Sequence, residues 1–203
     1  MQKQAKIFWT SYADLMTSLF FIMLVLFVLA IAMMKKDAKA NKEQIDMINN
    51  IQKSIEKLDK TYFSYDNDYK RFSLNKQIQF EPADSKIQDQ YKPYLLAVGK
   101  EIENLIVELK SDIKNKDIKY MIIIEGMASN DYYKRNDELS YLRALSLFKL
   151  WSQNNIYFDP SICELQIAGS GIKGVGRFQG KNNEFKNQRF LIQIIPKIGK
   201  LKN

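Results

Sequence analysis

One carboxylate stands inside the most apolar part of the sequence. Asp14 lies near the start of the run from Ile7 to Met34, and no further charge occurs between Leu15 and Met34. A helix of about 20 apolar residues crosses a bilayer, so the run is long enough to span a membrane. A carboxylate inside such a span costs roughly 2.5–3.5 kcal/mol on insertion scales and faces a partner or a water-filled path. Asp14 is therefore a candidate ion- or proton-carrying acid that faces another protein chain.

Hydroxyl side chains surround this carboxylate at helical spacing. Residues three and four positions apart share a face of a helix. Around Asp14 those positions hold Thr10, Ser11, Thr17 and Ser18. Such a stripe of oxygen atoms can share the solvation of H⁺ or Na⁺, and the acid can be neutralised by binding a proton. The alternative is that Asp14 only ends a helix at the headgroup level, although aromatic residues at 8, 9 and 12 extend the interfacial character upstream.

The apolar run predicts an uncleaved membrane anchor. It is longer than the apolar region of about 7–15 residues in a signal peptide, and no A-x-A cleavage site precedes the lysines that follow. Lysines lie on both sides of the span, at Lys3 and Lys6 before it and at Lys35, Lys36, Lys39 and Lys42 after it. The positive-inside rule alone would place the C-terminal side in the cytoplasm.

Composition argues against several classes of function. The chain has 203 residues, a net charge of +8, no histidine and one cysteine. Its lysines are scattered rather than gathered in a dense block, so we expect no nucleic-acid binding. Cys163 cannot form an internal disulfide, and its apolar surroundings predict a buried, inert thiol. We find no zinc-type ligand cluster and no hydrolase motif, and we expect a protein without catalytic residues, metal or cofactor.

Three parts follow one another along the chain. After a short N-terminus at 1–6, we expect a membrane helix at 7–34, a helical linker at 35–66 and a folded domain at 67–203. The linker carries apolar residues at 3-4-3 spacing, namely Ile48, Ile51, Ile55 and Leu58. This spacing fits either an amphipathic helix lying on its own domain or a short parallel coiled coil that pairs two copies. We favour pairing, with help from the span.

The folded domain alternates strand and helix patterns. A weakly alternating stretch at 71–80 predicts a strand pair that turns at Asn75-Lys76. Helical periodicity follows at 88–110 and 136–153, and apolar strand patterns occur at 118–125, 163–168 and 189–195, with a glycine-rich loop at 169–180. The order β-α-β-α-β-β predicts an α/β sandwich with its helices on one face of the sheet.

Two motifs resemble a known family. The run Phe8-Trp9-Thr10-Ser11-Tyr12-Ala13-Asp14-Leu15-Met16-Thr17 resembles the motif that opens the span of MotB-type ion-driven motor subunits. The run Asn136-Asp137-Glu138-Leu139-Ser140-Tyr141-Leu142-Arg143-Ala144 resembles the helix start of OmpA-like peptidoglycan-binding domains, and Asn187-Gln188-Arg189-Phe190 resembles their closing strand. The first run is especially similar to the B subunit of the Zorya anti-phage defence motor, and flagellar stators share much of it.

The resemblance implies a role for each matching residue. Asp14 would carry the ion, with the four hydroxyl residues beside it. The peptidoglycan site of OmpA-like domains uses an aspartate and an arginine to hold the charged ends of diaminopimelate. Arg143 matches the arginine, and Asn136 and Arg189 lie in the matching motifs. The family's aspartate position is Ser129 here, so Asp131 is the carboxylate that would substitute for it.

The resemblance also implies partners and a location. Two copies of the chain would sit inside a ring of five multi-span subunits, and H⁺ or Na⁺ passing Asp14 would drive rotation of that ring. The C-terminal domain would hold peptidoglycan in the periplasm, and the N-terminus of this single-pass inner-membrane protein would be cytoplasmic. That orientation contradicts the lysine count, but a long translocated domain crosses largely regardless of charge.

Three readings of function remain. The first is an ion-driven motor stator, in phage defence or of the flagellar type. The second is a passive peptidoglycan tether without ion flux, which would tolerate loss of the Asp14 charge. The third is a hydrolytic enzyme, which Glu125, Asp131 and Asp137 support little, since they resemble carboxylates at a strand end and a helix start.

Overall fold

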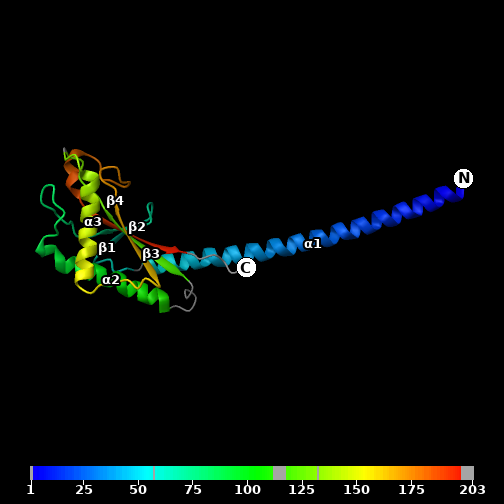
Figure 1. Ribbon diagram of the computed structural model, residues 1–203, viewed down its shortest axis with the longest axis horizontal. Helices are drawn as coiled ribbons and strands as arrows, with labels where there is room; N and C mark the ends of the chain where they lie inside the picture. Colours follow the sequence, from blue (N-terminus) through cyan, green and yellow to red (C-terminus); the bar gives the residue numbers. More distant parts are fainter. Residues whose placement is uncertain (1, 57, 112–117, 132, 198–203) are drawn as a thin grey trace. The chain divides into compact units, whose positions relative to one another are not determined.

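The structure is a computed structural model that describes residues 2–56, 58–111, 118–131 and 133–197; within the first helix, the side chains at 2–8, 10, 11, 40, 43, 44, 47 and 50 lie outside the description. The chain divides into two compact units, Met1–Met47 and Ile48–Asn203. The first unit is helical throughout its described part. The second holds the sheet and the remaining helices (Figure 1).

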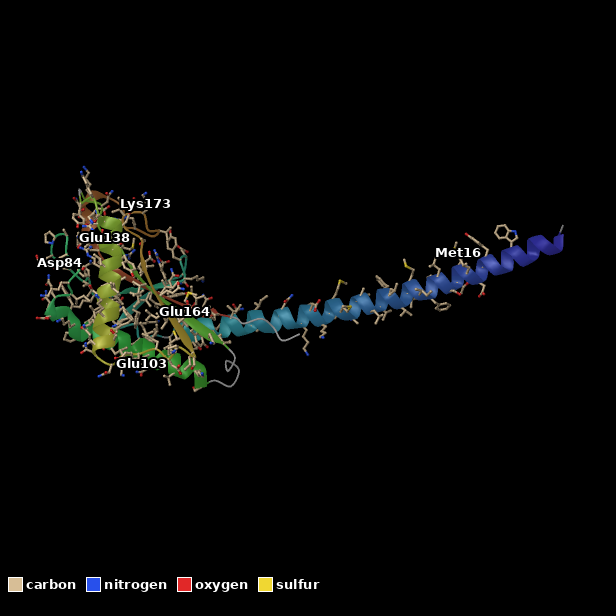
Figure 2. The ribbon with its side chains drawn as sticks, viewed as in Figure 1. Met16, Asp84, Glu103, Glu138, Glu164 and Lys173 are labelled. Carbon is tan, nitrogen blue, oxygen red and sulfur yellow. The ribbon has the colours of Figure 1, made fainter. Side chains whose placement is uncertain are left out.

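The N-terminal helix α1 (Gln2–Ile55) is continuous, because its sequence has neither glycine nor proline and is rich in leucine, methionine and alanine. Within the described residues, the segment Tyr12–Lys39 is long and apolar enough to cross a membrane, with a mean hydropathy of 2.8 and no buried side chains. Side chains stand out all around this part of α1, where Figure 2 labels Met16. Residues 12–34 of the span predicted at 7–34 lie in this segment, and the side chains at 7, 8, 10 and 11 lie outside the described residues.

The apolar seam of the linker packs on its own domain. Ile51, Ile55 and Leu58 are only 1%, 4% and 5% exposed within the second unit. The Gln52 side chain donates to the Tyr65 hydroxyl at 3.2 Å, which ties the same turns of α1 to strand β1 (Phe63–Asp66). These apolar residues therefore pack on their own domain, as in the amphipathic-helix alternative. The coiled coil that we favoured from the sequence would need the same residues to be exposed. Residues 48–66 of the predicted linker belong to the second unit.

Five strands form one mixed sheet in the order β1-β2-β5-β3-β4. The strands that follow β1 are β2 (Arg71–Leu74), β3 (Lys119–Gly126), β4 (Cys163–Gly169) and β5 (Phe190–Lys197). β3 and β4 are parallel, and the other neighbours are antiparallel. The strand predictions at 118–125, 163–168 and 189–195 are confirmed within two residues.

The first hairpin turns earlier than predicted. Residues 67–70 join β1 and β2. The prediction of a strand pair that turns at Asn75-Lys76 is therefore wrong. The Asp66 carboxylate accepts hydrogen bonds from the backbone N–H groups of Asp68 and Tyr69, and Lys70 takes a φ of 52°. The turn at 67–70 follows directly on a segment that was predicted to be helical. The alternating pattern at 71–80 therefore did not reveal that β2 pairs with the preceding strand β1.

Two helices cover one face of the sheet. They are α2 (Lys92–Ser111), preceded by the short η1 (Asp89–Tyr91), and α3 (Asn136–Gln153). The predicted helices at 88–110 and 136–153 are confirmed. α2 and α3 meet where the Trp151 indole N–H donates to the Leu95 carbonyl at 2.8 Å. A side chain at Gly99 would place its Cβ 2.6 Å from that indole nitrogen, so this approach requires glycine.

Alternate residues of β3 form the floor of the core. Tyr120, Ile122 and Ile124 are fully buried, while the residues between them are partly exposed. This period of two is the pattern of a sheet covered by helices on one face. Cys163 is buried as predicted, and burial raises the pKa of its thiol to about 11. The observed architecture is therefore an apolar N-terminal helix followed by an α/β domain, as the sequence predicts.

Candidate functional site

The candidate ion site lies on the apolar part of α1. Asp14, Thr17 and Ser18 are exposed residues of this helix, three and four positions apart on one face. The Thr17 hydroxyl donates to the Ala13 carbonyl at 2.7 Å. Thr10 and Ser11 belong to the same helix, but their side chains lie outside the described residues.

This arrangement leaves the Asp14 carboxylate available to a partner. The Thr17 proton is directed to the backbone, so its oxygen lone pairs face outward and can solvate a cation beside Asp14. A bare carboxylate on an otherwise apolar helix is costly in a bilayer unless a partner or a bound ion compensates it. Asp14, Thr17 and Ser18 therefore form a small polar patch on the apolar part of α1.

The second candidate site begins where β3 ends. Asp131 lies in the turn between β3 and α3, and its carboxylate accepts three hydrogen bonds from three donors. Its Oδ1 accepts from the Tyr133 backbone N–H and from the Asn136 amide, both at 2.9 Å. Its Oδ2 accepts from the Ser129 hydroxyl at 2.8 Å. Ser129 is 6% exposed, and its hydroxyl holds this neighbouring carboxylate in place.

The environment of Asp131 favours its charged form. Burial raises the pKa of this carboxyl group, but the hydrogen bonds from Asn136, Tyr133 and Ser129 and the positive charge of Arg143 outweigh burial. The net effect is a pKa below the usual value of 3.8. Asp131 is therefore ionised at neutral pH and presents a fixed negative charge.

Arg143 supplies the opposite charge from the buried side of α3. It is 3% exposed, its guanidinium lies 4.4 Å from the centre of the Phe80 ring, and its Nε donates to the Asp84 carbonyl at 3.2 Å. Burial lowers the pKa of Arg143 to about 10, against the opposing effect of Asp131 and Asp84. Figure 2 labels Asp84 on the loop that precedes α2.

Two buried polar atoms of this site have no partner within the described residues. They are Nη1 of Arg143 and Oδ1 of Asn136. A buried donor or acceptor left unpaired costs about 1–3 kcal/mol, so such atoms call for an explanation. A ligand with a carboxylate and an ammonium group would satisfy the guanidinium and the carboxylate of Asp131 together. Among the described residues, the site thus places a carboxylate, a guanidinium and two unpaired polar atoms close together in the fold.

Arg189 does not join this cluster. Its guanidinium donates to the Gly176 carbonyl at 2.7 Å and to the Ser73 hydroxyl at 3.4 Å, and it stacks 4.6 Å from the centre of the Phe178 ring. None of these groups contacts Arg143 among the described interactions. The predicted site residues thus divide into Ser129, Asp131, Asn136 and Arg143 on one side and Arg189 on the other.

Sequence reasoning missed three residues of the site. Phe80 and Asp84 hold Arg143 from a segment about 60 positions upstream, and Gln188 donates to the Ser129 hydroxyl at 3.0 Å. No short-range pattern links these positions to Arg143 or Ser129. The Glu81-Pro82-Ala83-Asp84 break, with a φ of 56° at Ala83, was the one local signal of a shaped loop.

Comparison with known proteins gives structural likenesses only. No protein-family model matches the sequence, and no curated protein matches it either. A periplasmic domain of MotB is similar at 19% identity and a TM-score of 0.45, over 64% of this chain and 65% of that chain. The periplasmic domain of Helicobacter pylori MotB is similar at 18% identity and a TM-score of 0.47, over 68% of this chain and 90% of that chain. The cell wall anchor of the type VI secretion system of Pseudomonas aeruginosa is similar at 15% identity and a TM-score of 0.42, over 66% of this chain and 91% of that chain.

Proposed function

We propose that this chain is the stator subunit of an ion-driven rotary membrane motor. One observation carries the proposal: a single carboxylate, Asp14, stands exposed with the hydroxyls of Thr17 and Ser18 on a helix that is otherwise apolar enough to span a membrane. A charge in that position is expensive and is kept where it serves ion or proton passage. The motif around Asp14, which resembles that of MotB-type subunits, supports the same role.

The C-terminal domain is the stationary part in this proposal. Asp131 and Arg143 present opposite charges beside unpaired polar atoms. This pair suits the carboxylate and ammonium groups of diaminopimelate in peptidoglycan. Held by the wall, the subunit would resist the torque that ion passage generates.

The proposed assembly has two copies of the chain inside a ring of five multi-span subunits. Two Asp14 side chains would then face the ring, each beside its own hydroxyl stripe. The seam of Ile51 and Ile55 is buried in the domain, so pairing would rest on the membrane helices and the ring. The N-terminus would be cytoplasmic and the domain periplasmic. The similarity of the first motif to the Zorya B subunit favours a role in phage defence over a flagellar one.

The test of ion transport is the substitution Asp14→Asn. The chain is expressed in its native host, and entry of H⁺ and of Na⁺ into the cells is followed with ion-sensitive dyes. We expect Asp14→Asn to abolish entry of the transported ion and Asp14→Glu to retain part of it. Asp37→Asn, an exposed aspartate on the same helix, is the matched control and should behave as wild type.

A passive tether is the competing outcome. If Asp14→Asn inserts into the membrane at the wild-type level and leaves both ion entry and cellular function unchanged, the motor proposal fails. The wall site is tested separately by sedimentation with purified sacculi. Arg143→Ala should be lost from the pellet, whereas Arg135→Ala, which removes an exposed arginine paired with Glu138, should be retained.

A further inference from the structure

A cavity lies on the β1–β2 side of the domain, and its lining includes none of the residues clustered around Arg143. It has a volume of about 570 Å³ and is lined by the hairpin strands, the segment after β2 and the residues around the end of the short helix η3 (Lys181–Asn187). We call it the hairpin groove. No step of the proposed function uses it, although Arg189 lies in its wall.

The hairpin groove is positively charged. Three cations line it, namely Lys76, Lys186 and Arg189, against the single carboxylate of Asp66. That carboxylate already accepts two backbone N–H groups in the hairpin turn. In the described part of the chain, neither lysine forms an ion pair. An anion is therefore the complementary ligand.

Aromatic rings lie beside all three cations. The Lys76 ammonium lies 5.5 Å from the centre of the Tyr91 ring and 5.7 Å from that of Tyr94, and rings of the groove wall contact the other two cations. The Lys186 ammonium lies 5.8 Å from the centre of the Phe185 ring and 5.9 Å from that of Phe178, and Arg189 stacks on Phe178. The two rings are 53% and 43% exposed, so apolar surface accompanies the charge. Rings and cations in this arrangement suit a ligand with both a flat or apolar face and a negative group.

The groove shares its wall with the site around Arg143. Phe190 lines the groove, and its ring centre lies 5.8 Å from that of Phe80, on which Arg143 stacks. A hydrogen-bonded chain makes the same connection. The Gln77 amide donates to the Gln188 carbonyl at 2.8 Å, and the Gln188 amide donates to Ser129. The groove and the Arg143 cluster are therefore neighbours through packed and hydrogen-bonded residues.

We propose that the hairpin groove is a second subsite for peptidoglycan, one that takes a carboxylate of the polymer next to the group bound at Arg143. The inference rests on the proposed wall binding and deepens it. Lys76 and Lys186 attract the carboxylate, and Phe178 and Phe185 pack against the adjoining apolar part. The subsite adds affinity that depends on salt, since its lysines are exposed.

The test uses the full chain in detergent and purified sacculi. Retention is measured across a range of salt concentrations for wild type and for the double variant Lys76→Gln/Lys186→Gln. We expect retention of the variant to be about threefold to tenfold weaker at low salt, as for the loss of two exposed ion pairs, and to fall less steeply with salt. Lys110→Gln/Lys149→Gln makes the same charge change on α2 and α3 and should match wild type.

A second arm identifies the anion. Sacculi whose carboxylates have been amidated with a carbodiimide should retain wild type no better than the groove variant. Equal retention of wild type and the groove variant on native sacculi would overturn the subsite, even with Arg143→Ala lost from the pellet. An equal loss in the control lysine pair, or a difference that persists on amidated sacculi, would also overturn it. Loss of the proposed function itself would appear instead as full retention of Arg143→Ala.

Discussion

At the residue scale, the turn after β3 shows how neighbouring side chains and backbone fix one carboxylate in place. Ser129 has no charge, yet it is buried and directs its hydroxyl at Asp131. Asn136 and the Tyr133 backbone hold the other oxygen of that carboxylate. The negative charge therefore stands two positions further along the chain and is still fixed by three donors.

Replacing Arg143 by methionine separates binding from stability. The methionine keeps apolar contact with Phe80 and removes a buried cation whose Nη1 has no partner. Because an unpaired buried donor costs about 1–3 kcal/mol, we expect the free energy of unfolding to stay the same or rise. Retention on sacculi should fall about tenfold or more, since a charged hydrogen bond to the ligand is lost. Chemical denaturation and sedimentation measure the two effects, and a variant that unfolds more easily would show that Arg143 is structural.

Acidification should reveal the fixed charge of Asp131. Its pKa lies below the usual 3.8 in the folded chain, so the unfolded chain binds the proton more readily. The resulting stability is present above the unfolded pKa and is lost as the pH falls through the folded one. The stability difference between wild type and Asp131→Asn should therefore shrink between pH 6 and pH 3, about the range around an aspartate pKa. A difference that is constant with pH, with Glu101→Gln as reference, would contradict this.

At the element scale, the last turns of α1 belong to the domain. Ile51 and Ile55 are almost fully buried, while Ile45 on the same helix is 56% exposed. An a/d seam and a domain-packing stripe have the same 3-4 spacing in a sequence. Burial decides between them here, and the domain uses the seam.

The packing role of α1 predicts a clear contrast between isoleucines of one helix. Ile51→Ala should lower the free energy of unfolding of the domain by about 2–5 kcal/mol, as expected for a large-to-small change in a core. Ile45→Ala should change it by less than about 0.5 kcal/mol, as for exposed positions. Thermal denaturation in detergent measures both. A change in oligomeric state at Ile51→Ala without a loss of domain stability would instead support the coiled coil.

At the scale of the whole molecule, the two compact units carry separate tasks in the proposed motor. The ion-binding carboxylate lies in Met1–Met47, and the wall site lies in Ile48–Asn203. No residue of the described site around Arg143 comes from the first unit. Ion transport and wall binding should therefore be separable by mutation.

Single variants in each unit test this separation. Asp14→Asn should leave retention on sacculi and the melting temperature of the domain at wild-type values while it abolishes ion entry. Arg143→Ala should lose retention on sacculi. It should still insert into the membrane and should keep ion entry. Cellular function should be lost in both, because torque requires both ion passage and a fixed point. Retention that falls with Asp14→Asn would show that the two tasks are coupled.

The sequence by itself determined the apolar helix, the stripe around Asp14 and most strands and helices of the domain. These features are local, since helical and strand periodicity and the spacing of hydroxyl groups can be read within a few turns. α3 was predicted at its observed bounds for this reason. Only the tertiary structure decided that Ile51 packs on the domain and that β1 pairs with β2 across residues 67–70.

The tertiary structure also decided the composition of the sites. Phe80 and Asp84 meet Arg143, and Gln188 meets Ser129, across about 60 positions of sequence. Arg189, which a motif placed with Arg143, lies in the hairpin groove instead. Contacts between distant segments depend on strand order and on how loops close over the sheet, and no short-range pattern encodes them. Asp14 and Asp131 were both candidates from the sequence alone, whereas the hydrogen bonds that fix Asp131 were visible only in the fold.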